Sequence, residues 1–232
     1  MSVIGIIPAR GGSQGIPGKN LAIVGNKTLL DRAIETAKKS GIIDRIIVDS
    51  DSDEIIAAAR KHCGVEILYK RPAHLATDVA ATADVILYLL QWLNINEQFK
   101  PDIVVLLEPT CPLRSADDIR QAYRVFVESG RPCLITISEP IQETYNMIQQ
   151  GESGWNYALP RLSNSKRRQD FPETRFINGG AYITKADFFL TTGKLYDLQQ
   201  MAVHVMPQER SIDINTPFDL SLARYFAAQF ER

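Results

Sequence analysis

The sequence predicts an α/β fold with a mostly parallel sheet. Short runs of β-branched residues alternate with segments of helical periodicity along the chain, and this alternation is typical of a sheet with helices on its faces. The chain has 232 residues, of which 45% are hydrophobic and 23% are charged, as in an ordinary globular protein. At this length we expect a single domain, residues 1–232, with one core.

The expected strands and helices follow one another in a regular order. Strands are predicted for the apolar runs at residues 3–7, 46–48, 65–69, 103–107 and 134–137. Two helix starts are marked by residue pairs with the spacing of a capping box, in which each partner satisfies a free backbone N–H group. These pairs are Asp51 with Glu54 and Ser115 with Asp118. Apolar stripes predict two buried helix faces, at Leu29, Leu30, Ala33, Ile34 and Ala37 and at Ile119, Ala122, Tyr123 and Phe126.

The segment after the fifth strand, residues 139–177, has few aliphatic runs and several polar clusters. We interpret it as an excursion from the sheet and not as a second domain. Strands at residues 180–183 and 203–206 are expected to return to the sheet. A last helix is predicted from Pro217 to the end of the chain, with Thr216 as its cap.

Charge and apolar runs exclude several classes of partner. Lys and Arg number 26 against 27 Asp and Glu, so the formal net charge of -1 draws the protein neither to a nucleic-acid polymer nor to an anionic membrane. No apolar run approaches the ~20 residues needed to cross a bilayer, and the first residues lack the features of a signal peptide. Cys63, Cys111 and Cys133 contain no CxxC pair, which favours free thiols. We therefore expect a cytoplasmic protein.

The segment directly after the first strand, residues 8–20, is the most informative of the chain. It reads PARGGSQGIPGKN and combines glycines with a hydroxyl and two cations. Backbone N–H groups and positive charge at the carboxyl end of a strand suit a polyphosphate. The glycine spacing does not match the GxGxxG of dinucleotide-binding folds, which disfavours a dehydrogenase, and it does not match a Walker A loop.

Further motifs follow this loop along almost the whole chain. Residues 71–78 carry RPxxLAxD, residues 106–114 carry LLEPTCPLR, residues 168–172 carry RQxxP, residues 178–182 carry NGGAY and residues 211–216 carry SIDINT. Together with residues 8–20 they resemble the motifs of the acylneuraminate cytidylyltransferases, the CMP-sialic acid synthetase family. The resemblance implies a three-layer Rossmann-like nucleotidyltransferase fold with an excursion used for dimerisation. The implied reaction transfers CMP from CTP to the anomeric hydroxyl of a nonulosonic acid and releases pyrophosphate.

The resemblance also implies catalytic roles for three charged residues. Arg10 and Lys19 would hold the triphosphate together with the loop amides, Arg10 as a planar fork and Lys19 as a point charge. Asp213 would be the main protein ligand of Mg²⁺, an ion that prefers oxygen donors and substrate phosphates. Asn215 stands where relatives often carry a second carboxylate, so it would bind the ion directly, bind it through water, or serve the structure.

Other substrate contacts implied by the resemblance lie in or beside the same motifs. For the nucleotide they are Pro8, Ala9, Gly11, Gly12, Ser13, Gln14, Asn20, Arg71, Ala80 and Thr82, and for the sugar they are Glu108, Arg168, Asn178 and Tyr182. Arg168 matches the carboxylate of the sugar, because bidentate recognition of a carboxylate by arginine is strong and directional. Family members are typically homodimers that share residues between clefts, so Arg168 would act in cis or in trans.

Four positions leave alternatives open. Gln14 replaces a common lysine and Asn215 a common carboxylate, so a non-catalytic CTP-binding relative is the alternative to an enzyme. Glu108 replaces a common glutamine in the sugar pocket, which leaves sialic, legionaminic and pseudaminic acids open as substrates. Asp78 either belongs to the site or caps the helix that follows it.

Overall fold

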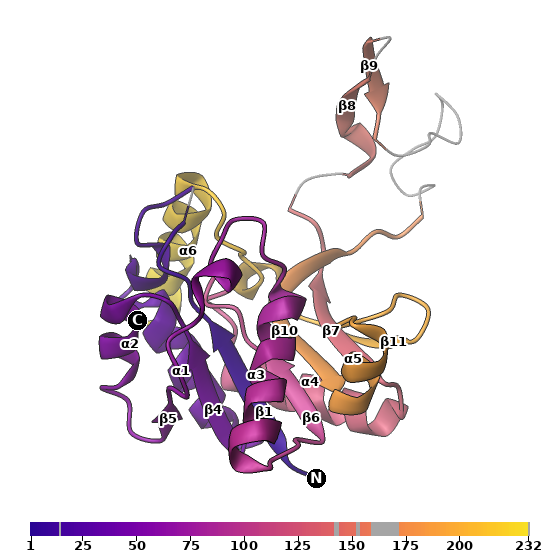
Figure 1. Ribbon diagram of the computed structural model, residues 1–232. Helices are drawn as coiled ribbons and strands as arrows, with labels where there is room; N and C mark the ends of the chain where they lie inside the picture. Colours follow the sequence, from indigo (N-terminus) through magenta and orange to yellow (C-terminus); the bar gives the residue numbers. More distant parts are fainter. Residues whose placement is uncertain (14, 142–143, 152–153, 159–171, 232) are drawn as a thin grey trace.

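The structure is a computed structural model that describes residues 1–13, 15–141, 144–151, 154–158 and 172–231. In this part of the chain a seven-stranded sheet has the strand order β11-β7-β10-β6-β1-β4-β5 (Figure 1). Its strands are β1 (Val3–Pro8), β4 (Arg45–Asp49), β5 (Val65–Glu66), β6 (Ile103–Leu106), β7 (Cys133–Ser138), β10 (Phe176–Lys185) and β11 (Met201–Val205). β10 runs antiparallel to both of its neighbours, and the other pairs of this sheet are parallel. The predicted α/β fold with a mostly parallel sheet is confirmed.

Helices cover both faces of the sheet. α1 (Leu29–Ser40), α2 (Asp53–Ala59) and α4 (Ala116–Ser129) pack on one face, and α3 (Thr82–Glu97) and α5 (Ala186–Thr192) pack on the other. α6 (Pro217–Phe230) covers a third, smaller core with Leu113, Ile212 and Ile214. Short 3-10 turns are formed by Lys19–Leu21, Ala73–Leu75, Thr144–Asn146 and Gln208–Arg210. The helices and the sheet between them give three layers, as expected.

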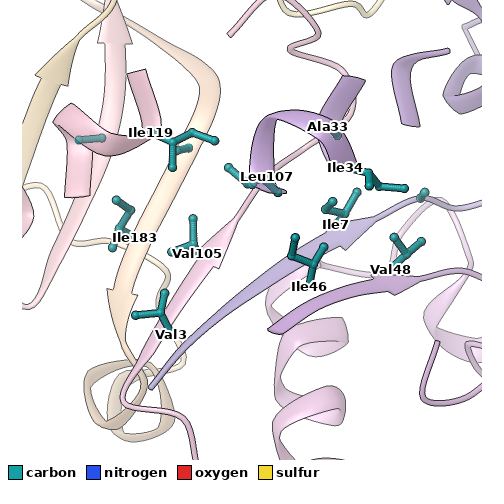
Figure 2. Close-up of a cluster of buried hydrophobic side chains, with 14 of the residues drawn as sticks. Val3, Ile7, Ala33, Ile34, Ile46, Val48, Val105, Leu107, Ile119 and Ile183 are labelled. Atoms are coloured by element: carbon teal, nitrogen blue, oxygen red, sulfur yellow. The ribbon is translucent and has the colours of Figure 1, made fainter. Parts of the chain in front are cut away.

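Alternation along the strands explains why both faces are covered. In β1, Val3 and Ile7 belong to the core under α1 and α4, whereas Ile4 and Ile6 belong to the core under α3. Figure 2 shows part of the first core, where Ile7 lies against Ile34 of α1. Each fully buried side chain of this size contributes about 1.5–3 kcal/mol relative to an exposed one.

Capping residues fix where the helices begin. The predicted box of Ser115 and Asp118 opens α4, and Thr216 caps α6 as expected. The predicted pairing of Asp51 with Glu54 is wrong by one residue. The N-cap of α2 is Ser52, whose hydroxyl accepts a hydrogen bond from the backbone N–H of Ile55. Asp51 instead accepts a hydrogen bond from the backbone N–H of Gly11 at 2.8 Å.

Two hairpins were not predicted. β2 (Ile23–Val24) pairs with β3 (Lys27–Thr28), and β8 (Ile148–Gly151) pairs with β9 (Gly154–Tyr157). The second hairpin lies in the segment interpreted as an excursion and stands apart from the main sheet in Figure 1. Strands of two to four residues give too short an alternation to be recognised in a sequence. No helix in the described part of the chain is long and apolar enough to cross a membrane.

Candidate active site

A cavity of about 440 Å³ is lined by residues at the carboxyl ends of β1 and β6. These strand ends lie at the upper edge of the sheet in Figure 1. Residues that the sequence assigned to the site and that line it are Pro8, Arg10, Ser13, Lys19, Asn20, Arg71, Ala80, Thr82, Glu108, Asp213 and Asn215. It is also lined by Gly15, Leu75, Thr77, Val85, Pro109 and Thr110, which the sequence analysis did not assign. Of these six residues, all except Val85 lie inside the motifs described above. Membership of a motif could therefore have indicated that they belong to the site.

The loop after β1 is held to the sheet by its own backbone. The N–H of Ala9 donates to the carbonyl of Asp49 at 2.9 Å, and the side-chain amide of Asn20 donates to the carbonyl of Arg10 at 2.9 Å. Gly15 packs so closely on the segment after Asp213 that a Cβ there would lie 2.5 Å from the carbonyl oxygen of Asn215. A side chain at Gly15 would therefore push the loop of residues 8–20 away from the segment that carries Asp213.

Three expected nucleotide contacts do not line the cavity. Ala9 is fully buried in the core, and the N–H of Gly11 is already bonded to Asp51, so neither presents its expected group to the cavity. Gly12 has open space around the position of a Cβ but is not a lining residue. Gln14 lies outside the described residues.

Arg10 and Asp78 form an ion pair in the wall of the cavity. The guanidinium Nη1 lies 2.5 Å from a carboxylate oxygen of Asp78, and both side chains line the cavity. The alternative role of Asp78 as a helix cap is not supported, because Ala81 is the N-cap of α3 and no side-chain hydrogen bond is made there. The pair with Asp78 therefore fixes the Arg10 guanidinium at the cavity.

Lys19 connects the loop of residues 8–20 to the segment that carries Asp213. Its ammonium donates to the carbonyl of Ile214 at 3.0 Å. Burial lowers the pKa of Lys19, and the nearby charges of Asp213 and Glu108 offset this effect only in part. The site thus places one half-buried cation beside two carboxylates.

Glu108 lies two residues after the end of β6 and lines the cavity. Burial and, after it, the charge of Asp213 raise its pKa to about 7, against smaller opposing effects of Arg114 and Lys19. Gly179 packs against it, because a Cβ at Gly179 would lie 3.2 Å from a Glu108 oxygen. Gly179 adopts φ +67°, a left-handed conformation that favours glycine.

The raised pKa predicts a pH-dependent stability that depends on Glu108. The folded protein holds a proton that the unfolded chain releases, so the free energy of unfolding should fall as pH rises from about 4.5 to about 7. Glu108→Gln cannot ionise and should raise the unfolding temperature relative to wild type at about pH 8, with a smaller difference at about pH 5. Thermal unfolding without nucleotide measures this, with the exposed Glu128→Gln as control. An equal difference at both pH values would contradict the prediction.

Asp213 has the properties of a metal ligand. One carboxylate oxygen accepts from the side-chain amide of Asn215 at 2.7 Å, and the other is buried without a hydrogen-bond partner among the described residues. A buried oxygen of this kind is expected to have a partner, and Mg²⁺ prefers such oxygens together with phosphate oxygens. No group of three or more His, Cys, Asp or Glu side chains in the described chain could form a metal site alone. The donor set therefore suits an ion that shares its ligands with a bound substrate.

Arg71 is positioned rigidly at the cavity. It is buried, its Nη2 donates to the carbonyl of Asp49 at 2.9 Å, and its Nε donates to the Asp49 carboxylate. Ala80 and Thr82 line the cavity beside the start of α3. A fixed guanidinium next to a helix start can recognise a flat polar group such as a nucleobase.

The expected sugar contacts lie in different places. Asn178 is fully buried and does not line the cavity: its Oδ1 accepts from Thr136 at 2.6 Å and its Nδ2 donates to Ser211 at 2.8 Å. Its amide thus serves the fold, which corrects the assignment to the sugar. Tyr182 also does not line the cavity, and burial and the charge of Glu108 raise the pKa of its hydroxyl. Arg168 lies outside the described residues.

Comparison with known proteins identifies the family. The family model described as cytidylyltransferase matches residues 4–219. The chain is 31% identical to the pseudaminic acid cytidylyltransferase of Campylobacter jejuni, over 94% of this chain and 93% of the relative. It is 30% identical to the CMP-N,N'-diacetyllegionaminic acid synthase of Legionella pneumophila, over 96% of this chain and 94% of the relative.

A solved structure has the same fold. The CMP:2-keto-3-deoxy-manno-octonic acid synthetase complexed with CTP aligns with a TM-score of 0.71 over 99% of this chain and 100% of that chain. At 14% identity this likeness concerns the fold alone. The family model and the relatives confirm the resemblance found in the motifs, and the chain belongs to the cytidylyltransferase family.

Proposed function

We propose that this chain activates a nonulosonic acid of the sialic type by transferring CMP to it from CTP. The anomeric hydroxyl oxygen would bond to the α-phosphorus, the bond from that phosphorus to the bridging oxygen would break, and pyrophosphate would leave as the hydroxyl loses its proton. The observation that carries the proposal is the cavity at the strand ends, where Arg10 and Lys19 lie close to Asp213 and Glu108. Relatives named for the same reaction type support it.

The chemistry asks the protein mainly for positioning and for positive charge. Arg10 and Lys19 would hold the phosphate oxygens, and Arg71 would orient the base. Asp213, with Asn215 beside it, would hold Mg²⁺ through its unpartnered oxygen. The chemistry supplied by a bound ion is neutralisation of charge on the phosphate oxygens.

The experiment that tests this function is a substrate panel. Purified protein with CTP and Mg²⁺ should release pyrophosphate with at least one of sialic, legionaminic or pseudaminic acid, measured by a coupled pyrophosphate assay. Above its pKa of about 7, the Glu108 carboxylate favours a sugar that offers hydrogen-bond donors at its position, because an anion cannot replace the donor of a glutamine amide. Absence of turnover with the whole panel would refute the proposal.

A second candidate is a CTP-binding relative without catalysis. It is motivated by Asn215, whose amide donates to Asp213 and brings no charge to the metal position. Calorimetry would then detect CTP binding without turnover, and Asn215→Asp would leave the rates at background.

We also propose a homodimer built on the β8–β9 hairpin. Trp155 is 67% exposed and Ile148 is 55% exposed on this hairpin, and apolar side chains on a protruding element indicate a protein contact. Trp155→Ser should lower the dimer fraction in sedimentation experiments at micromolar concentration. The control Leu190→Ser, at an exposed position of α5, should leave the dimer fraction unchanged. Equal dimer fractions for wild type and Trp155→Ser would contradict this role.

We place the protein in the cytoplasm, where CTP is made. Cys63, Cys111 and Cys133 are free thiols, as expected in a reducing compartment. Fractionation of cells that produce the protein would test this, since recovery in a membrane or extracellular fraction would contradict it.

A further inference from the structure

The segment that carries Asp213, residues 207–216, depends on the rest of the protein for its position. Its only regular structure is the short turn Gln208–Arg210, which is too short to be stable alone. We propose that the ion pair between Arg210 and Asp118 positions the Asp213 carboxylate in the cavity, so that Arg210 is a positioning residue for the reaction. This inference rests on the proposed function.

The ion pair has a bidentate geometry. Arg210 donates from Nε to one Asp118 oxygen at 2.9 Å and from Nη2 to the other at 2.8 Å. Asp118 is 5% exposed and stands in the first turn of α4. Parallel charge-assisted bonds of this kind fix direction as well as distance. The pair therefore joins the segment before Asp213 rigidly to α4.

Electrostatics support a strong pair. Burial alone would raise the pKa of Asp118, but hydrogen bonds from Arg210 and Ser115 outweigh it and lower that pKa. The hydrogen bond to Asp118 in turn raises the pKa of Arg210. Both groups are thus held in their charged forms.

Further contacts leave Asp213 between two anchored points. On one side Ser211 accepts from Asn178 at 2.8 Å and donates to the carbonyl of Pro207 at 2.8 Å. On the other side the backbone N–H of Ile214 donates to the carbonyl of Thr110 at 2.8 Å. The Lys19 ammonium also donates to the carbonyl of Ile214. The Arg210 pair differs from these contacts because it joins two opposite charges, and Arg210 lies three positions before Asp213.

The ion pair also relates the position of Asp213 to that of Glu108, and both of these residues line the cavity. Glu108 lies in residues 106–114, and α4 begins directly after this segment. The pair of Arg210 with Asp118 therefore connects both Asp213 and Glu108 to the start of α4.

The test compares Arg210→Gln with Arg210→Lys and with a matched control. Asp118 keeps its hydrogen bonds from Ser115 at 2.7 and 2.8 Å in these variants, so α4 stays capped and the protein should fold. The control is Arg120→Gln on the same helix, where Arg120 and Asp117 form an exposed pair at 3.4 Å.

We expect Arg210→Gln to lower kcat by about 10-fold or more and to leave the KM for CTP within about 3-fold of wild type, because the Arg210 side chain bonds to Asp118 and does not line the cavity. Arg210→Lys should recover part of the loss, since a lysine keeps the charge but not the fork. Arg120→Gln should match wild type. Unchanged kcat in Arg210→Gln, or an equal loss in Arg120→Gln, would overturn the proposal.

Amide hydrogen exchange in the free protein gives a second readout that needs no turnover. The N–H of Ile214 should exchange several-fold faster in Arg210→Gln than in wild type, while core amides of β1 keep their rates. A uniform acceleration of all amides would show a purely structural role and overturn the proposal. If wild type turned over no sugar, the proposed function would fail, yet this measurement would still decide whether Arg210 holds the segment.

Discussion

Asp213→Ala should lower kcat by at least about 100-fold with little change in the unfolding temperature. The carboxylate has one buried oxygen without a partner among the described residues and lies beside Lys19 and Glu108, so its removal takes charge from the reacting centre. It also removes a repulsive neighbour of Glu108, so the fold should not suffer. Initial rates of pyrophosphate release together with thermal unfolding measure both effects.

The control for this variant is Glu209→Ala. Glu209 is a carboxylate on the same segment but does not line the cavity, and its loss should leave kcat close to wild type. If Asp213→Ala kept more than about a third of the wild-type rate, Asp213 would have no role in catalysis.

Lys19→Met is expected to lower kcat/KM for CTP by about 100-fold. Methionine keeps the length of the side chain but loses the ammonium that bonds to the carbonyl of Ile214 at 3.0 Å and faces Asp213. Because burial already lowers the pKa of Lys19, removal of this charge should not destabilise the fold severely. Rates at varied CTP concentration measure the change.

A matched lysine is available outside the cavity. Lys27 lies on β3 and pairs with Glu35 at 2.6 Å, so Lys27→Met removes one cation without touching the site. A loss in Lys27→Met as large as that in Lys19→Met would show that net charge, and not the position of Lys19, determines the effect.

The sequence predicted the features that depend on local pattern. The cap at Ser115, the strand at residues 3–7 and the charged loop after it all follow from residues close together in the chain, and the structure bears them out. Motifs far apart in sequence were assigned to one site through the family resemblance. Parallel strands end at one edge of the sheet, and this brings those motifs together in the structure.

Features that depend on distant pairing were missed. The register between β10 and β7 shifts between Ile177 and Tyr182, and this irregularity turns Asn178 inward toward Thr136. Tyr182 lies five positions after Ile177, whereas their partners on β7 are only two positions apart, and strand periodicity gives no sign of such a bulge. The bond from Gly11 to Asp51 was missed for the same reason, because it joins two loops that meet only in the folded sheet.

The contacts of Lys19 with Ile214 and of Gly15 with Asn215 also constrain the order of folding. The bond from Lys19 to Ile214 spans 195 positions, so nearly the entire chain must be closed into a loop before the phosphate loop meets the carboxylate segment. During synthesis the first strands and α1 can pack early, whereas the binding site can be complete only after the last helix has left the ribosome. A nascent chain that stops before residue 207 should therefore bind no CTP, however much of its sheet has formed.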